Sequence, residues 1–229
     1  MKLAINMFRT AILLALFAIV CTALVAFTFQ NTRGRIAQSE REALLLKLHS
    51  VVSPDMYNNE LIKDITTVTS KKYLGTDLPV PVFRARKDGK PVAVILTPIA
   101  PNGYNGPIKL IIGIKVDGTL SGVRVLAHNE TPGLGDAIEE RRSPWIHTFE
   151  NRSLQNPGKK GWKVKRDGGD FDQFTGATIT PRAVVKAVHN ALLFFAANKD
   201  HLFEEKLPTQ APKTNVPNTN APKPQAVQG

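Results

Sequence analysis

Oxygen-bearing side chains gather around a glycine and an alanine at one point of the sequence, where they could hold a phosphate group. The stretch FDQFTGATITPRAVVKAV begins at residue 171 and contains Asp172, Thr175, Thr178 and Thr180. Gly176 and Ala177 are small enough for a ligand or a modifying enzyme to approach the backbone closely. A threonine hydroxyl in this loop could carry a phosphate through an ester bond. An ordinary loop before a helix would have the same spacing, so both interpretations stay open.

A helix is predicted to follow these residues directly, from Thr180 to Ala197. Thr180 is the expected N-cap and Pro181 suits the first helical position. One face of this helix is apolar, because the spacing is four, three and four between Val184, Val188, Ala191 and Phe195. The free N–H groups and the dipole at the start of a helix attract an anion. Arg182 and Lys186 could add positive charge there.

A second polar segment, HNETPGLGD, begins at His128 and precedes a candidate helix, AIEERR. Its last half has a structural explanation, since Pro-Gly favours a turn, Asp136 could cap the helix and Glu139 could complete a capping box. That explanation does not account for Glu130 and Thr131. The histidines show no metal-ligand spacing, and one His128–Glu130 pair is a weak signal, so we expect no metal site.

Two hairpins are predicted upstream of these segments. Asp88-Gly89 separates apolar runs within residues 79–98, and Asp117-Gly118 does the same within residues 108–126. Asp-Gly is a strong signal for a two-residue hairpin turn. Gly161 to Lys165 is a further strand candidate. Because strands and helices come in blocks, we predict an α+β fold with an antiparallel sheet and packed helices.

The N-terminal part contains an apolar run of 19 residues without a charge, from Ala11 to Phe29. As a helix it would be about 28 Å long, close to the hydrocarbon thickness of a bilayer and longer than the core of a signal peptide. We therefore predict a transmembrane anchor at 11–29 after a cytoplasmic N-terminus at 1–10. Lys and Arg nearly balance on the two sides. The short leader favours an inner-membrane protein with its globular part in the periplasm.

The rest of the chain divides by pattern into four parts. An amphipathic linker helix is expected at 30–52, since Leu44, Leu48 and Val51 share one face. Residues 53–100 and 101–205 are expected to form the two parts of the extracytoplasmic domain. Residues 206–229 are rich in proline and lack periodicity, so we predict a disordered tail.

The formal net charge is +11, and the basic residues are scattered along the chain. No basic stripe is interleaved with aromatic residues, which argues against nucleic acid as a partner. The charges are expected to form a solvated surface that could dock an acidic partner or lipid headgroups. The one cysteine, Cys21, lies in the apolar run. It leaves no thiolates outside the anchor for a disulfide or an iron–sulfur cluster.

The motif Asp172-x-x-Thr175-Gly176-Ala177-Thr178 resembles the recognition sequence at which a flavin transferase attaches FMN covalently. This resemblance implies that Thr178 carries the FMN phosphate as an ester, that Asp172 belongs to the recognition sequence, and that Thr175, Gly176 and Ala177 shape the cofactor-binding loop. Thr175 stands where serine is often found, which keeps the hydroxyl.

The segment from Glu130 to Gly135, ETPGLG, resembles the companion loop of the same FMN-binding domain. This second resemblance implies that residues 101–205 form the FMN-binding domain and that its flavin site is lined by Glu130, Thr131, Leu134 and Gly135.

With the anchor, the length and both motifs in this order, the chain resembles the G-subunit family of the Rnf ion-translocating electron transport complexes up to about residue 205. The C subunit of the sodium-pumping NADH:quinone reductase is the nearest related family. The resemblance implies an electron-carrier subunit that relays electrons through covalent FMN and turns over no substrate alone. Its partners would be the other Rnf subunits, the membrane and the flavin transferase. The alternatives are a flavin-free, membrane-anchored scaffold or docking subunit, or the equivalent subunit of a sodium-pumping NADH:quinone reductase.

Overall fold

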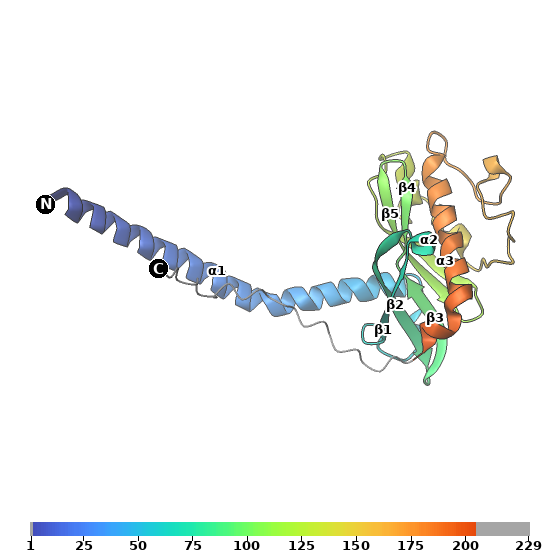
Figure 1. The fold of residues 1–229 in the computed structure, drawn as a ribbon, viewed down its shortest axis with the longest axis horizontal. Helices are drawn as coiled ribbons and strands as arrows, with labels where there is room; N and C mark the ends of the chain where they lie inside the picture. Colours follow the sequence, from blue (N-terminus) through green and yellow to red (C-terminus); the bar gives the residue numbers. More distant parts are fainter. Residues whose placement is uncertain (1, 205–229) are drawn as a thin grey trace, which may run out of the picture.

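The computed structural model of the chain describes residues 2–204, a long N-terminal helix followed by an α+β domain (Figure 1). The tail predicted at residues 206–229 lies outside the described residues. The helices are α1 (Lys2–His49), α2 (Lys71–Leu74) and α3 (Ile179–Phe203), with short 3-10 helices η1 (Pro54–Met56), η2 (Gly135–Ile138), η3 (Pro144–Phe149) and η4 (Lys165–Asp167). The strands are β1 (Ile65–Ser70), β2 (Thr76–Lys87), β3 (Lys90–Leu96), β4 (Ile99–Gly103), β5 (Gly106–Lys115) and β6 (Leu120–Ala127).

All strand pairs in the sheet are antiparallel, as the sequence predicted. The order is β1-β2-β3-β5-β4, and β6 also pairs with β5. Both predicted hairpins are confirmed. Asp88 and Gly89 have φ of 52° and 75°, which is the backbone that a type I′ turn needs. The expected division at residue 100 falls inside β4, and the strands on both sides of it share one sheet.

The sheet is covered on both faces. Alternation along each strand sends successive side chains to opposite faces, so Leu96 and Ile112 pack in the core under α3, whereas Ile95 and Ile111 pack in a second core with the end of α1. The predicted apolar face of α3 is confirmed, because its residues are all buried: Val184, Val188, Ala191 and Phe195.

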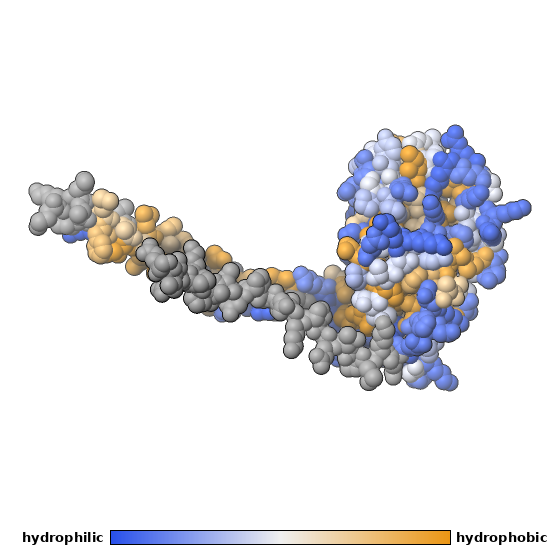
Figure 2. Space-filling model, in the orientation of Figure 1, coloured by the Kyte–Doolittle hydropathy of each residue, from blue (hydrophilic) through white to orange (hydrophobic). Residues whose placement is uncertain are grey.

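Helix α1 is one continuous helix of 48 residues, about 72 Å long. It is long and apolar enough to cross a membrane, and Figure 2 shows apolar surface along its N-terminal part. The linker helix predicted at 30–52 is therefore the second half of the same helix. Leu48 is buried in the last turn, and Val51 and Val52 continue this packing after α1 has ended at His49.

Two predicted elements are wrong. Gly161 to Lys165 is not a strand, since only Val164 forms an isolated bridge, to Phe171. Gly161 packs so tightly that a Cβ there would lie 2.5 Å from Pro157, and the chain turns instead of extending. AIEERR is not an α-helix but the end of η2 followed by turns. Pro144 disfavours helical backbone in the residue before it and leaves too few residues for a stable helix.

Candidate functional site

The two polar segments found in the sequence line one cavity of about 430 Å³ beside the start of α3. Seven of the nine expected site residues line it: Glu130, Thr131, Leu134, Gly135, Gly176, Ala177 and Thr178. The other two do not, because Thr175 and Asp172 are exposed outside the cavity. The fold thus brings together segments that are about 45 residues apart in the chain.

The loop before α3 is a tight turn whose shape depends on glycine. The N–H of Ala177 donates to the carbonyl of Phe174 at 3.2 Å, and Gly176 has φ of 80°, the left-handed value that type II turns need at this position. A Cβ on Gly176 would also lie 3.2 Å from Cδ2 of Leu134. The turn and the companion loop are therefore in contact across the cavity.

Thr178, and not Thr180, is the N-cap residue of α3. Its φ of −78° and ψ of −28° are helical, and its side chain makes no capping hydrogen bond. The hydroxyl therefore stays available at the cavity. The expectation that Thr180 caps the helix is wrong, and Pro181 is the third helical residue instead of the first. Proline is still tolerated there because N–H groups of the first turn have no helical partner.

Glu130 is a buried carboxylate at the start of α3, only 4% exposed. Its Oε1 accepts the N–H of Asn105 at 3.1 Å, and its Oε2 accepts the hydroxyl of the fully buried Thr180. Among the described residues it forms no ion pair. Negative charge is favoured at a helix N-terminus, so Glu130 stabilises the start of α3 from a distant part of the chain. This contact also explains why Thr180 points inward.

Two glycines make room for the Glu130 carboxylate. A Cβ on Gly135 would lie 2.8 Å from Glu130 Oε2 and 3.0 Å from Thr180 Oγ1. A Cβ on Gly103 would lie 2.7 Å from Glu130 Oε1. Any larger residue at either position would displace the carboxylate. Gly103 carried no signal in the sequence, because nothing local links it to Glu130.

Hydrogen bonds of His128 and Glu139 hold the companion loop, which runs from Glu130 to Gly135, in place. The N–H of Glu130 donates to His128 Nδ1 at 3.0 Å, so Nε2 carries the ring proton and donates to Glu139 at 2.8 Å. The hydrogen bond from Arg141 lowers the pKa of Glu139 to about 2, with a smaller contribution from His128 and against the effect of burial. Glu139 is thus a partner of His128 and does not complete a capping box.

Aromatic packing holds the loop that precedes α3 and contains Asp172 and Phe174. Trp145 Nε1 donates to the carbonyl of Asp172 at 2.8 Å, and its ring meets Phe174 edge-on at 5.1 Å. The Asp172 carboxylate points outward to Lys165, with 2.6 Å between Oδ1 and Nζ. It is therefore on the surface, where an enzyme could contact it. Trp145 lies in η3, and nothing in the sequence indicated that it would hold this loop.

Positive charge does not reach the cavity from Arg182 or Lys186, contrary to expectation, since neither residue lines it. Arg182 instead donates twice to Asp167, at 2.6 and 2.5 Å. The favourable charge for an anion must come from the N-terminus of α3 itself.

Sequence reasoning missed two residues that line the cavity, Tyr104 and Ile179, and it gave Thr180, which also lines it, the role of a helix cap. The side chains of Tyr104, Leu134 and Ile179 are exposed at 65%, 44% and 47%. Exposed apolar side chains around a cavity that also holds polar groups are typical of a site for a largely apolar ligand. Tyr104 follows β4 in a turn without a recognisable motif, so only the fold identifies it.

The arrangement fits an FMN group by its own chemistry. A free hydroxyl stands at a helix N-terminus that favours a phosphate, and apolar side chains beside it suit a planar ring system. The glycines of both loops leave space that a Cβ at Gly135 or Gly176 would reduce.

Comparison with known proteins agrees with this geometry. Residues 103–193 match the family model described as FMN-binding domain, and residues 1–51 match one described as RnfG N-terminal region. Similar curated proteins are named as the G subunit of an ion-translocating oxidoreductase complex. The protein from Shewanella baltica is 50% identical over 205 residues, covering 90% of this chain and 97% of its own length.

Two further relatives with the same name show a similar extent. The Pseudomonas aeruginosa (strain UCBPP-PA14) protein is 50% identical over 197 residues, covering 86% of this chain and 92% of its own. The Vibrio atlanticus protein is 46% identical over 199 residues, which cover 87% of this chain and 95% of the Vibrio protein. Together with the apolar helix α1, these matches indicate a membrane-anchored protein with an FMN-binding domain.

Proposed function

The chain belongs to the G-subunit family of ion-translocating oxidoreductase complexes, and from this we propose that it is an anchored flavoprotein whose FMN is esterified to Thr178. It relays electrons within an Rnf-type complex that couples ferredoxin–NAD chemistry to ion movement. Its partners are the other subunits of that complex and, during maturation, a flavin transferase. The globular domain lies in the periplasm, where the covalent bond prevents loss of a cofactor that is not readily replaced there.

The observation that carries this proposal is the uncommitted hydroxyl of Thr178. It lines the cavity and makes no capping hydrogen bond. The other threonines are poorer candidates, because Thr180 is fully buried and donates to Glu130, and Thr175 is exposed outside the cavity. Only Thr178 combines a free oxygen with the anion-favouring end of α3.

Attachment requires an activated donor, since direct esterification would release water. A bond forms between Thr178 Oγ and the phosphorus of FMN, and the phosphoanhydride bond of a nucleotide-activated flavin breaks. A nucleoside monophosphate leaves, and the hydroxyl proton passes to a base of the transferase. The exposed Asp172 and Thr175 present the surface that the transferase recognises.

Once bound, FMN supplies the electron chemistry, and this chain supplies position and electrostatics. The N-terminus of α3 would hold the phosphate. Glu130 and Thr180 keep that end of the helix in place, and Tyr104, Leu134 and Ile179 would cover apolar parts of the ring system and exclude water.

Fluorescence of the protein band on a denaturing gel tests the proposal, because only a covalent flavin stays with the chain. We expect a fluorescent wild type from the native host, a dark Thr178→Val variant and a fluorescent Thr175→Val variant with reduced loading. Peptide mass mapping should place FMN on Thr178. A dark wild-type band would favour the flavin-free scaffold, and FMN on another residue would refute the assignment to Thr178.

A further inference from the structure

A second cleft, about 390 Å³ in volume, lies next to the flavin site on the face of α3 that meets the preceding segment. We call it the basic cleft, and its polar lining consists of Lys163, Asp167, Arg182, Lys186 and His189. Its floor is apolar, with Trp162, Val164 and Val185 all buried. None of these residues belongs to the cavity that contains Thr178.

The basic side chains that line the cleft outnumber its acidic ones. Its one acid, Asp167, is fully engaged by the two hydrogen bonds from Arg182. Within residues 2–204, no ion pair is formed by Lys159, Lys160, Lys163, Arg166 or Lys186. Burial, together with the charge of nearby Lys159, holds the pKa of His189 below its ordinary value. The ring therefore stays neutral at pH 7, and the lysines supply the charge.

The segment that presents Lys159, Lys160 and Lys163 is held in place, although η4 is its one helical element among the described residues. Trp162 stacks on His189 of α3, with centroids 5.4 Å apart and planes 9° from parallel, and its Nε1 donates to the carbonyl of Ser153 at 3.2 Å. A Cβ on Gly169 would lie 2.1 Å from the carbonyl oxygen of Lys163. Such packing fixes the backbone that carries Lys163, as a docking surface requires.

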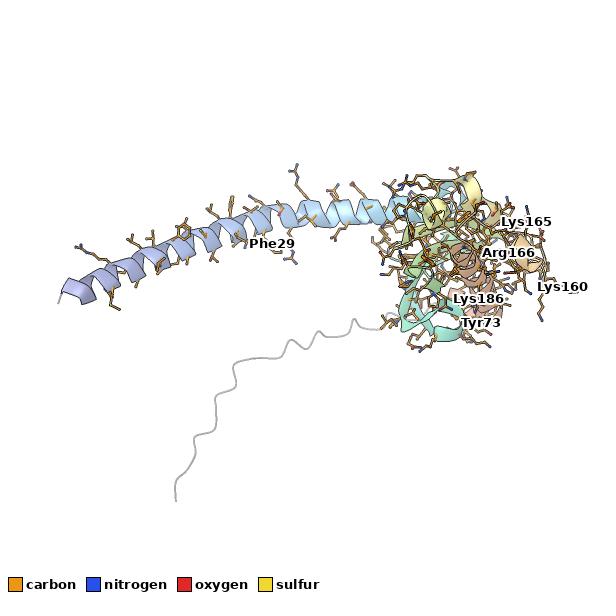
Figure 3. All side chains as sticks on the ribbon, turned by 90° about the horizontal axis from the view of Figure 1, so that it is seen from above. Phe29, Tyr73, Lys160, Lys165, Arg166 and Lys186 are labelled. Carbon is orange, nitrogen blue, oxygen red and sulfur yellow. The ribbon has the colours of Figure 1, made fainter. Side chains whose placement is uncertain are left out.

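The position of the basic cleft argues against lipid headgroups as its partner. In Figures 1 and 3 the segment with Lys160, Lys165 and Arg166 lies at the end of the domain away from α1. The helical residues 30–49 alone extend about 30 Å beyond the predicted anchor, and charge interactions are screened over about 8 Å at physiological salt. The membrane that holds α1 is therefore too far away.

Nucleic acid is a poorer fit than protein. The aromatic ring in the cleft, Trp162, is only 4% exposed and already stacks on His189, so it offers no free face to a base. The segment beside the cleft also contains Asp167, Asp170 and Asp172 close to its basic residues in sequence. Mixed charges of this kind match the surface of an acidic protein better than a continuous phosphate backbone.

We propose that the basic cleft docks an acidic protein surface that exchanges electrons with the flavin on Thr178. Lys186 is eight residues beyond Thr178 on α3, about 12 Å along the helix, so a protein bound there would lie beside the flavin site. Complementary charge steers such an encounter and orients the partner without a large apolar interface. The electron exchange rests on the proposed function, whereas the docking can be measured without it.

Site-specific photo-crosslinking in native membranes tests the docking. A benzophenone amino acid replaces Lys163 in the full-length protein, and the same probe at Lys90, the exposed first residue of β3, is the control. We expect Lys163 to give a crosslink to a protein segment of net negative charge and Lys90 to give none. Adding Lys159→Glu and Lys186→Glu should reduce the yield at least about tenfold, as should raising the salt to about 0.5 M.

A matched pair, Lys90→Glu with Lys199→Glu, removes the same charge from other exposed positions and should leave the Lys163 crosslink within about twofold of wild type. The proposal would be overturned by the absence of a crosslink at Lys163 or by a crosslink to nucleic acid or lipid. It would also be overturned by a protein crosslink whose yield changes neither with salt nor with charge reversal. Fluorescence of the same gel band reports flavin attachment separately. A crosslinked band without fluorescence would refute covalent flavin attachment but would still support the docking surface.

Discussion

Replacing Thr180 by aspartate distinguishes the two roles that this residue could have at the start of α3. At an N-cap, aspartate is as good as threonine, so a capping role predicts almost no loss of stability. In the structure, the Thr180 hydroxyl donates to the buried Glu130 carboxylate. Thr180→Asp would place a second carboxylate against the first, in a position that solvent does not reach.

The expected cost follows from Coulomb's law. Two carboxylates about 4 Å apart at an effective dielectric constant near 20 repel by about 4 kcal/mol. Thr180→Val only removes the donor to a charged acceptor, and should cost about 2 kcal/mol. The exposed Thr175→Val should change the unfolding free energy by less than about 0.5 kcal/mol. Urea unfolding followed by the fluorescence of the buried Trp145 and Trp162 measures all three.

The pH dependence gives the aspartate variant a second signature. Repulsion raises the pKa of the carboxyl pair in the folded state, so the penalty should be nearly absent below the pKa of the unfolded groups, about 4, and grow as the pH rises above it. A Thr180→Asp variant as stable as wild type at pH 7, or one with an equal loss at pH 4 and pH 7, would refute the role of Glu130 described here.

Three further predictions follow from the site and the anchor. The pKa of Glu139 is lowered from 4.5 to about 2, so the stability that Glu139 contributes should disappear as the pH falls from 4.5 to 2. Glu139→Gln should therefore make the unfolding free energy depend less on pH in this range. An unchanged pH dependence would show that the Arg141 contact is unimportant. Gly135→Ala should lose about 1–3 kcal/mol and lower the flavin fluorescence, whereas Gly89→Ala, in an open turn, should cost stability from its positive φ but leave flavin loading unchanged. Protease added to spheroplasts should degrade the domain of the wild type, and protection until lysis would reverse the orientation.

Much of the fold could be predicted because its signals are local. The Asp-Gly turns, the apolar face of α3 and the charge-free run in α1 each depend on neighbouring residues and on the period of one element. Resemblance to a family motif also pointed to seven residues that line the cavity: Glu130, Thr131, Leu134, Gly135, Gly176, Ala177 and Thr178. The antiparallel sheet followed from the alternation of the two hairpins.

The errors arose where a distant residue decides the local structure. Thr180-Pro181 has the local pattern of a helix start. In the structure, however, the Thr180 hydroxyl donates to Glu130, 50 residues away, and the N-cap residue is Thr178. Glu139 fits a capping box in sequence, yet His128 engages it across 11 residues. Tyr104 enters the cavity only because β4 and β5 form a hairpin there. Such contacts have no period or motif that a single sequence reveals.

The displaced cap has a consequence for the attachment of FMN. A threonine that capped α3 with its own hydroxyl would lose that hydrogen bond on esterification, at a cost of about 1 kcal/mol. Here the capping position and the stabilising acceptor are separated, since Thr178 makes no capping bond and Glu130 holds Thr180 instead. The proposed ester would therefore form without weakening the helix that carries it. The phosphate of the proposed ester would add its negative charge at the end of α3 where the helix dipole favours it.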